Sequence, residues 1–147
     1  MFVSSDGNTI KAGQNFLNVI ENGLVNCIAA IYLISPESVQ RSWISFELGA
    51  VWVRNAISRQ NGGPEIPAIP FCHSDMTFRD LPQPICNLNG IEANRSHSLE
   101  FAFKSIQTAV GGKGRLRTDF DVLAEKVNIF ERDYTVFKSI GEILGLI

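Results

Sequence analysis

The chain has 147 residues, of which 45% are hydrophobic and 19% are charged, and its formal net charge at pH 7 is −2. This composition predicts one globular domain with a real core and excludes a disordered chain. A charge this close to neutral provides no field that would gather nucleic acid or anionic lipid, so we expect neither as a partner.

The three cysteines, Cys27, Cys72 and Cys86, are odd in number and widely spaced. They resemble neither a disulfide framework nor a zinc-ligand set, and they indicate a reducing compartment. No apolar run reaches the roughly 18 residues that span a bilayer, and no signal-peptide pattern is present. His73 and His97 fall in predicted loops without a ligand partner at metal spacing. The sequence therefore predicts a cytoplasmic protein without membrane contact or bound metal.

The first half of the chain alternates between strand and helix patterns. A short strand end at 2–4 runs into a loop of turn-forming residues, and apolar spacing predicts a helix over 15–25. The continuous apolar run 27–34 predicts a strand that is buried on both faces, as parallel sheets require. A second helix opens directly after it, at 35–38, and ends before the turn residues at 61–64.

Three further elements complete the predicted sheet. Residues 66–71 form a short strand whose two prolines cannot donate to a ladder, so we expect it near an edge or only briefly paired. After a long loop, residues 88–91 predict a brief strand and residues 98–110 predict a helix. Strands and helices in alternation predict an α/β fold in which helices cover both faces of an open parallel sheet.

The last third of the chain predicts a hinge at 111–114 and then a long helix that begins at a capping pattern, Thr118-x-x-Asp121. One seam of this helix keeps 3-4-3-4-3 spacing and consists of Phe120, Leu123, Val127, Phe130, Tyr134 and Phe137, with Leu144 returning on it. Two interpretations remain open, a helix packed on its own domain and a self-association helix. We divide the chain into a domain at 1–112 and a segment at 113–147 that holds the linker and the C-terminal helix.

Two segments place polar residues where open α/β sheets bind ligands, at the carboxyl ends of strands. The loop from Ser4 to Gly13 enters a helix N-terminus, which can offer backbone N–H groups to a phosphate. Trp43 and Glu47 follow the buried strand and, four residues apart, share one face of a helix. An indole beside a carboxylate suits an oxocarbenium-like centre or a ribose hydroxyl. The simpler interpretation of that spacing is a core tryptophan beside a glutamate favoured by the helix dipole.

Several motifs, taken in order, resemble those of TIR (Toll/interleukin-receptor) domains, the bacterial ones especially. They are the loop from Ser5 to Gly13, the strand from Ile31 to Pro36, the segments Ser42 to Ala50 and Ile66 to Pro70, and the segment Leu88 to Ile91. The resemblance covers residues 1 to about 110. It implies a flavodoxin-like open parallel sheet. In the family a strand and a helix precede the segment that begins here at Met1, so we expect an N-terminally incomplete TIR fold.

The same resemblance implies NAD as a substrate, with no cofactor, and other TIR domains as partners through self-association. Glu47 matches the glutamate with which enzymatic members cleave the nicotinamide–ribose bond of NAD, and Trp43 matches the tryptophan four residues before it. The loop that shapes the nucleotide pocket and mediates contacts between TIR domains supplies Ser5, Asp6, Ile10 and Gly13.

Three functions follow from these patterns. The first is an NAD glycohydrolase that acts in TIR-type signalling or defence and yields ADP-ribose or a cyclised form. The second is a non-enzymatic interaction module that assembles through the 5–13 loop and the helix from Thr118. The third is a deoxyribosyltransferase-like enzyme, against which Trp43 and the Ile10–Gly13 loop argue.

Overall fold

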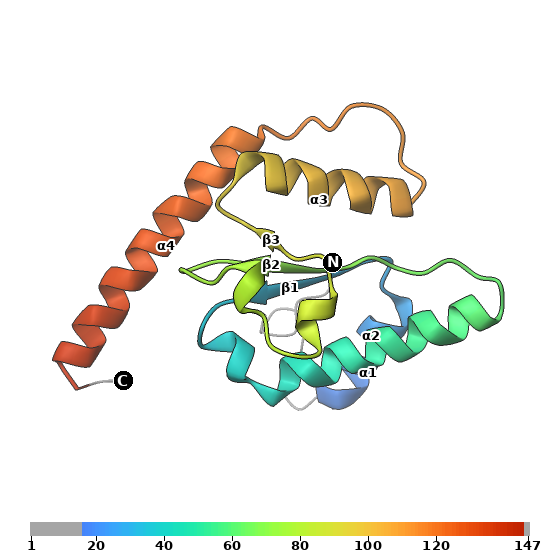
Figure 1. The fold of residues 1–147 in the computed structure, drawn as a ribbon, viewed down its shortest axis with the longest axis horizontal. Helices are drawn as coiled ribbons and strands as arrows, with labels where there is room; N and C mark the ends of the chain where they lie inside the picture. The colour runs from blue at the N-terminus through green and yellow to red at the C-terminus, as the bar shows by residue number, and fades with distance from the viewer. Residues whose placement is uncertain (1–15, 146–147) are drawn as a thin grey trace.

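The computed structural model describes residues 16–145, which form a mixed α/β fold around a parallel sheet of three strands (Figure 1). The strands are β1 (Ala30–Ile34), β2 (Ala68–Cys72) and β3 (Ile91–Glu92), in the spatial order β1-β2-β3. The helices are α1 (Phe16–Asn26), α2 (Ser42–Gln60), α3 (Ser96–Ala109) and α4 (Phe120–Ile143). Three short 3₁₀ turns are η1 (Ser38–Gln40), η2 (Phe78–Asp80) and η3 (Ile85–Asn87).

Helices cover both faces of this sheet, as the alternating pattern predicts. Helices α1 and α2 lie on one side, α3 lies on the other, and α4 runs along the edge at which the strands end (Figure 1). Each face has its own buried cluster. Tyr32, Ile34 and Leu48 belong to the cluster under α2, whereas Ile69 and Phe71 belong to the cluster under α3 and α4. Burial of these apolar side chains is the main force that holds the layers together.

The predicted helix at 15–25 is confirmed as α1, and a cation joins its end to α2. The guanidinium Nη1 of Arg54 donates to the carbonyl oxygen of Leu24 at 2.9 Å and to that of Cys27 at 2.7 Å. The last carbonyl groups of a helix have no partner within the helix, so an arginine from a neighbouring element satisfies them well. The predicted end of the second helix before Asn61 is also confirmed.

The expectation that the first strand is buried on both faces is wrong for β1. Its side chains alternate, so that Tyr32 and Ile34 are buried while Ile31 is 46% and Leu33 is 62% exposed. β1 is an edge strand of the sheet that the structure describes, and α3 and α4 pack over β2 and β3 instead. Successive side chains of a strand point to opposite faces, so an apolar run is exposed wherever one face has no cover.

Of the two alternatives predicted for the proline-containing strand, the edge position is wrong, because β2 is the middle strand of the sheet. Brief pairing is confirmed on one side, where β2 pairs with β3 over two residues. Pro67 and His73 both bond to β1 through their backbone, so the alternation of a parallel ladder turns Pro70 toward β3. Pairing with β3 begins only at Phe71 opposite Ile91. The missing N–H of Pro70 therefore faces a stretch without a ladder, where it costs no hydrogen bond.

The C-terminal helix begins at a different cap from the predicted one. Oδ1 of Asp119 accepts hydrogen bonds from the backbone N–H groups of Asp121 and Val122, each at 3.1 Å, so Asp119 and not Thr118 is the N-cap. Side-chain carboxylates are as good at this position as hydroxyl groups. Within residues 16–145 no helix has both the length and the apolar composition needed to cross a membrane.

Candidate functional site at the carboxyl edge of the sheet

The carboxyl ends of the three described strands meet at one edge, because the strands run parallel. The chain leaves β1 at Ser35, passes through η1 and enters α2, so the first turns of α2 lie beside this edge (Figure 1). Open α/β sheets bind ligands outside the carboxyl ends of their strands. The side chains of this edge, and of the start of α2, are therefore the ones to consider for chemistry.

Trp43 and Glu47 lie on the first two turns of α2, one turn apart, as their spacing predicts. The indole Nε1 of Trp43 donates a hydrogen bond of 2.9 Å to Oε1 of Glu47, and both side chains are partly buried. The ring of Phe46 stacks on the indole, with ring centroids 5.0 Å apart and an interplanar angle of 25°. A hydrogen bond to a carboxylate is among the stronger ones, so it fixes the orientation of Glu47.

Tyr32 is a third member of this neighbourhood that sequence reasoning missed. It is 5% exposed, and its hydroxyl is buried without a hydrogen-bond partner among residues 16–145. Burial, and then the negative charge of Glu47, raise the pKa of Tyr32 far above its ordinary value of 10.0. The signal was available in part, because a tyrosine inside an apolar strand must direct its hydroxyl somewhere.

The residues expected to complete the nucleotide pocket are Ser5, Asp6, Ile10 and Gly13, and all four lie outside the described residues. The expected strand end at 2–4 lies outside them as well. The structure therefore brings together Trp43 and Glu47, and it leaves the contribution of the predicted loop as a prediction.

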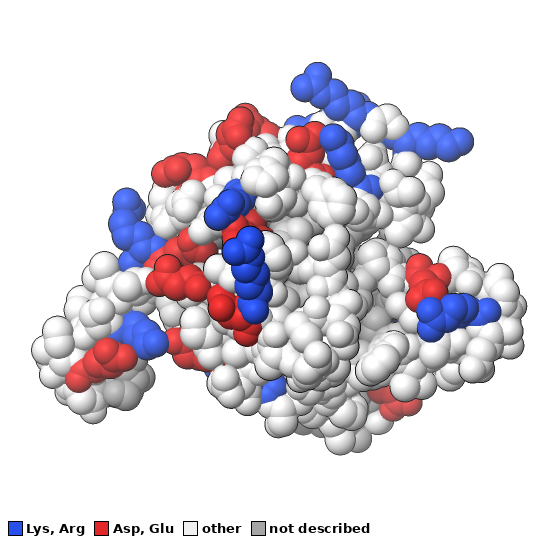
Figure 2. Space-filling model, viewed as in Figure 1, with Lys and Arg blue, Asp and Glu red and all other residues white. Residues whose placement is uncertain are grey.

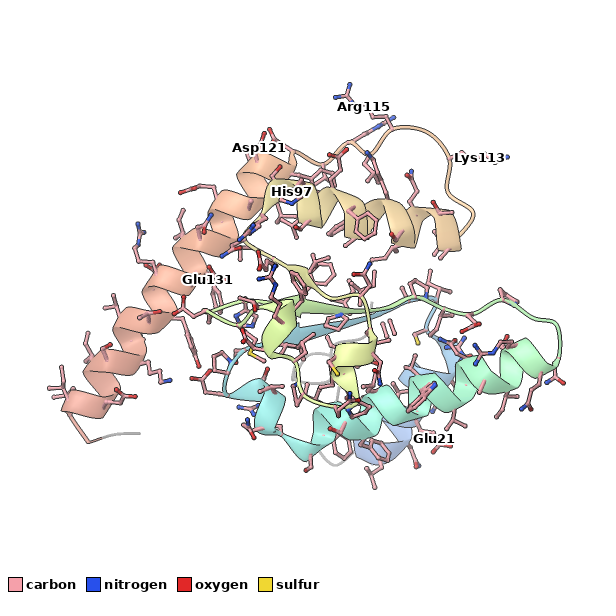
Figure 3. All side chains as sticks on the ribbon, in the orientation of Figure 1. Glu21, His97, Lys113, Arg115, Asp121 and Glu131 are labelled. Carbon is pink, nitrogen blue, oxygen red and sulfur yellow. The ribbon has the colours of Figure 1, made fainter. Side chains whose placement is uncertain are left out.

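A second polar cluster joins α4 to the ends of β2 and β3. The carboxylate of Glu131 accepts a hydrogen bond of 2.8 Å from the backbone N–H of Ser74 and one of 3.0 Å from the side-chain amide of Asn94. Figure 3 shows Glu131 directed from α4 toward the strand ends. The two donors follow different strands, so one carboxylate ties both strand ends to the helix.

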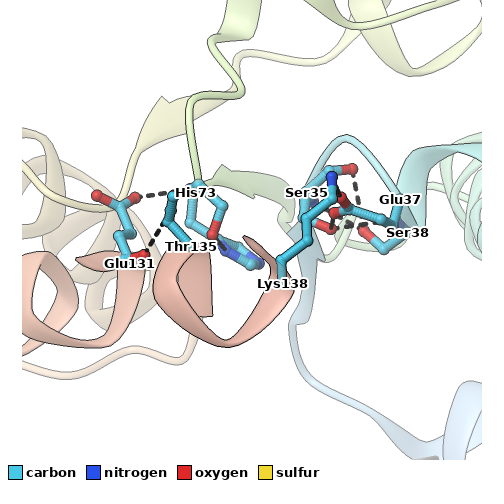
Figure 4. A network of polar contacts seen from close by, with 8 residues as sticks. Ser35, Glu37, Ser38, His73, Glu131, Thr135 and Lys138 are labelled. Atoms are coloured by element: carbon cyan, nitrogen blue, oxygen red, sulfur yellow. Dashed lines mark hydrogen bonds and ion pairs between the residues drawn. The ribbon is translucent and has the colours of Figure 1, made fainter. Parts of the chain in front are cut away.

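Farther along α4, a cation reaches the end of β1. Nζ of Lys138 lies 2.6 Å from Oε1 of Glu37, whose other oxygen accepts from the hydroxyl of Ser35 at 3.0 Å (Figure 4). The Lys138 ammonium, as the largest cause, lowers the pKa of Glu37 from 4.5 to about 2. Glu131 and Lys138 are seven positions apart on one face of α4, so this helix crosses the carboxyl ends of all three described strands.

His73 and Ser74 are close enough to suggest a nucleophile and its base, and the geometry argues against that role. Nδ1 of His73 lies 2.9 Å from Oγ of Ser74, but the two residues are neighbours in one turn and Ser74 is only 7% exposed. The backbone of Ser74 is left-handed, with φ of 53°. Phe130 packs edge-on against the imidazole, and burial lowers the pKa of His73 below 6.5. Ser74 is buried and His73 is partly buried, so the serine hydroxyl is poorly placed to meet a substrate.

Other candidate ligands of the described region are spread out. Among residues 16–145, no three histidine, cysteine, aspartate or glutamate side chains gather as metal ligands do. Lys113 and Arg115 point away from the body on the loop between α3 and α4 (Figure 3), and basic side chains extend outward there in Figure 2. Both side chains are exposed, as the interpretation of this segment as a solvated linker predicts.

Two of the hollows on the described surface lie away from Trp43 and Glu47. One, of about 1080 Å³, lies between α3 and the linker, and it is lined by both basic and acidic side chains. The other, of about 220 Å³, lies beside the second half of α2 and has Trp52 at its wall. The carboxylate of Glu47 is defined here by its hydrogen bond to Trp43 and by the ring of Phe46 stacked on that indole.

Comparison of the sequence with models of known protein families gives no match, and comparison with curated proteins gives none.

Proposed function

We propose that this chain is a TIR-type domain that cleaves the bond between nicotinamide and ribose in NAD, in signalling or defence, with Glu47 as its essential carboxylate. The observation that carries the proposal is the 2.9 Å hydrogen bond from the indole of Trp43 to Glu47, on the helix that follows β1. The ordered motifs that resemble TIR domains supply the reaction class, and the mixed α/β fold with a parallel sheet agrees with that resemblance.

The chemistry that this pair offers is electrostatic. As nicotinamide leaves, positive charge develops on the ribose carbon and ring oxygen, and a fixed carboxylate stabilises that charge. Its orientation is set before the substrate binds, because Nε1 of Trp43 holds one of its oxygens. The indole and the stacked ring of Phe46 add a flat apolar surface beside the carboxylate, suited to a planar base.

The test is release of nicotinamide from NAD by the purified chain at high protein concentration, compared with Glu47→Gln. Glutamine keeps the size of the side chain and its acceptor oxygen but removes the charge, so we expect release to be abolished. Glu125→Gln, an exposed site on α4, is the matched control and should release nicotinamide at the wild-type rate. Release that survives Glu47→Gln would overturn the site assignment. An excess of free nucleosides that suppresses release would favour the deoxyribosyltransferase-like reading.

The second candidate is an interaction module without enzymatic activity, which binds other copies of itself. It is favoured by the exposed apolar side chains along α4, of which Phe137 is 80% and Ile143 is 82% exposed. No nicotinamide release from the wild type, together with self-association that persists in Glu47→Gln, would select this candidate over the enzyme.

A further inference from the structure

Helix α4 has an outer face that is apolar over most of its length. Figure 1 shows the helix along one side of the molecule, with no other element of residues 16–145 beyond it. The apolar residues of this outer stripe, with their exposed fractions, are Val122 51%, Ile129 39%, Phe130 53%, Phe137 80%, Ile140 50% and Leu144 62%. At about 100° per residue they fall within a sector about 100° wide. Contiguous exposed apolar surface of this kind marks interaction sites.

The inner face of the same helix is already occupied. Phe120, Leu123 and Val127 pack on the cluster under α3, and Glu131 and Lys138 bond to the strand ends. Most of the outer stripe lies on a different side of the helix from these residues, and Phe130, at the border between the two faces, also packs against His73. A partner that covers the stripe can therefore bind without any change in how α4 is docked on its own domain.

Two charges lie within the outer stripe, and they indicate which partner fits it. Lys126 and Asp133 are both exposed and are seven positions apart, which is about 10 Å along a helix. Asp133 also contacts Arg132 of its own chain at 3.5 Å, but both side chains are well exposed (66% and 72%), so this pair contributes little. The stripe thus carries one positive and one negative charge, placed symmetrically about the point between Ile129 and Phe130.

This arrangement is self-complementary in only one orientation. If two α4 helices lay parallel and in register, Lys126 would face Lys126 and Asp133 would face Asp133. If they lie antiparallel about the point between Ile129 and Phe130, each Lys126 faces the Asp133 of the other copy. The same pairing sets Val122 against Phe137 and Ile129 against Phe130. Opposite charges that meet across an interface fix its orientation, whereas like charges disfavour the alternative.

We propose that the outer stripe of α4 binds a second copy of this chain, with the two helices antiparallel and Lys126 paired with Asp133 twice across the two-fold axis. The proposal is independent of NAD cleavage, because neither Trp43 nor Glu47 takes part. Under this proposal both interpretations of the C-terminal helix hold, each for a different face. The inner face packs on its own domain and the outer face associates with a copy.

The experiment uses the full chain and two charge-reversed variants, Lys126→Asp and Asp133→Lys, followed by sedimentation over a range of protein concentrations. Each variant alone places like charges opposite one another twice, so we expect its self-association to weaken by about tenfold or more. An equimolar mixture of the two variants restores opposite charges at both positions, so the mixture should associate as the wild type does. Glu142→Lys, which makes the same change in net charge as Asp133→Lys but outside the stripe, should leave association unaltered.

The mixture keeps the test decisive even if one reversal perturbs the monomer, because a damaged helix would not recover on mixing. A wild-type chain that stays monomeric at every concentration would overturn the proposal. So would single variants that associate normally, or a mixture that remains as weak as its components.

Discussion

The indole nitrogen of Trp43 and the carboxylate oxygen of Glu47 are 2.9 Å apart, joined by a hydrogen bond across one turn of α2. This bond connects an aromatic surface to a charge and gives the pair a fixed geometry. Because the two side chains belong to one helix, their relation does not depend on how the rest of the domain is arranged.

Replacing Trp43 with Phe separates the two contributions of the indole. Phenylalanine keeps an aromatic ring for stacking on Phe46 but has no N–H to hold Glu47. A hydrogen bond to a charged group contributes about 1.5–3 kcal/mol, so we expect nicotinamide release to fall by roughly tenfold or more. Trp43→Ala should be at least as slow. Wild-type rates in Trp43→Phe would show that the carboxylate is oriented by something else.

Glu131 should be a strong point of attachment for α4. Glu131→Gln turns one acceptor oxygen into an N–H₂ group, which cannot accept from both Ser74 and Asn94. We expect the free energy of unfolding to fall by about 1–3 kcal/mol, measured by denaturant titration. Glu125→Gln, exposed on the same helix, should change it little. Equal effects in the two variants would contradict the attachment.

The contact between Glu37 and Lys138 predicts a dependence of stability on acid. The pKa of Glu37 is lowered from 4.5 to about 2 in the folded chain. Stabilisation from this group is therefore complete above about pH 4.5 and is lost as the pH falls toward 2. In that window the melting temperature should change less steeply with pH for Glu37→Gln than for the wild type. Glu21→Gln, an exposed site on α1, should retain the wild-type slope.

Tyr32→Phe tests the buried hydroxyl. Removing a polar group that has no partner relieves a desolvation cost, so stability should stay the same or rise by up to about 1 kcal/mol. Tyr134→Phe, where the hydroxyl interacts with Glu37, should lower stability instead. A lower melting temperature for Tyr32→Phe would mean that the hydroxyl is satisfied in solution. Slower nicotinamide release at unchanged stability would add Tyr32 to the site.

Local spacing was enough to predict the Trp43–Glu47 pair and the bounds of α1, because both depend on helix geometry alone. It was not enough for the place of β2 in the sheet. The rule that proline belongs at an edge considers the whole strand. The cost is decided only by the direction in which the backbone nitrogen of Pro70 points and by the length of β3.

The residues of the seam predicted on α4 do not all face the domain, and helix geometry explains why. A seven-residue repeat drifts by about 20° per heptad on a straight α-helix of 3.6 residues per turn. Phe120, Leu123 and Val127 face the domain, but Phe130 and Phe137 have rotated toward solvent. The inner positions that take their place are Glu131 and Lys138. Their partners, up to 101 positions away in the chain, could be found only once the fold was known.

The position of α4 across the strand ends also bears on the order in which the domain is completed during synthesis. Ser35, Ser74 and Asn94 leave the ribosome well before residues 131–138 do. Until α4 is synthesised, the groups at the carboxyl edge of the sheet therefore lack the partners that Glu131 and Lys138 provide. Contacts between distant parts of a chain form late, because a large loop has to close first. The sheet and its first helices can therefore assemble early, and the last helix then locks the strand ends in place.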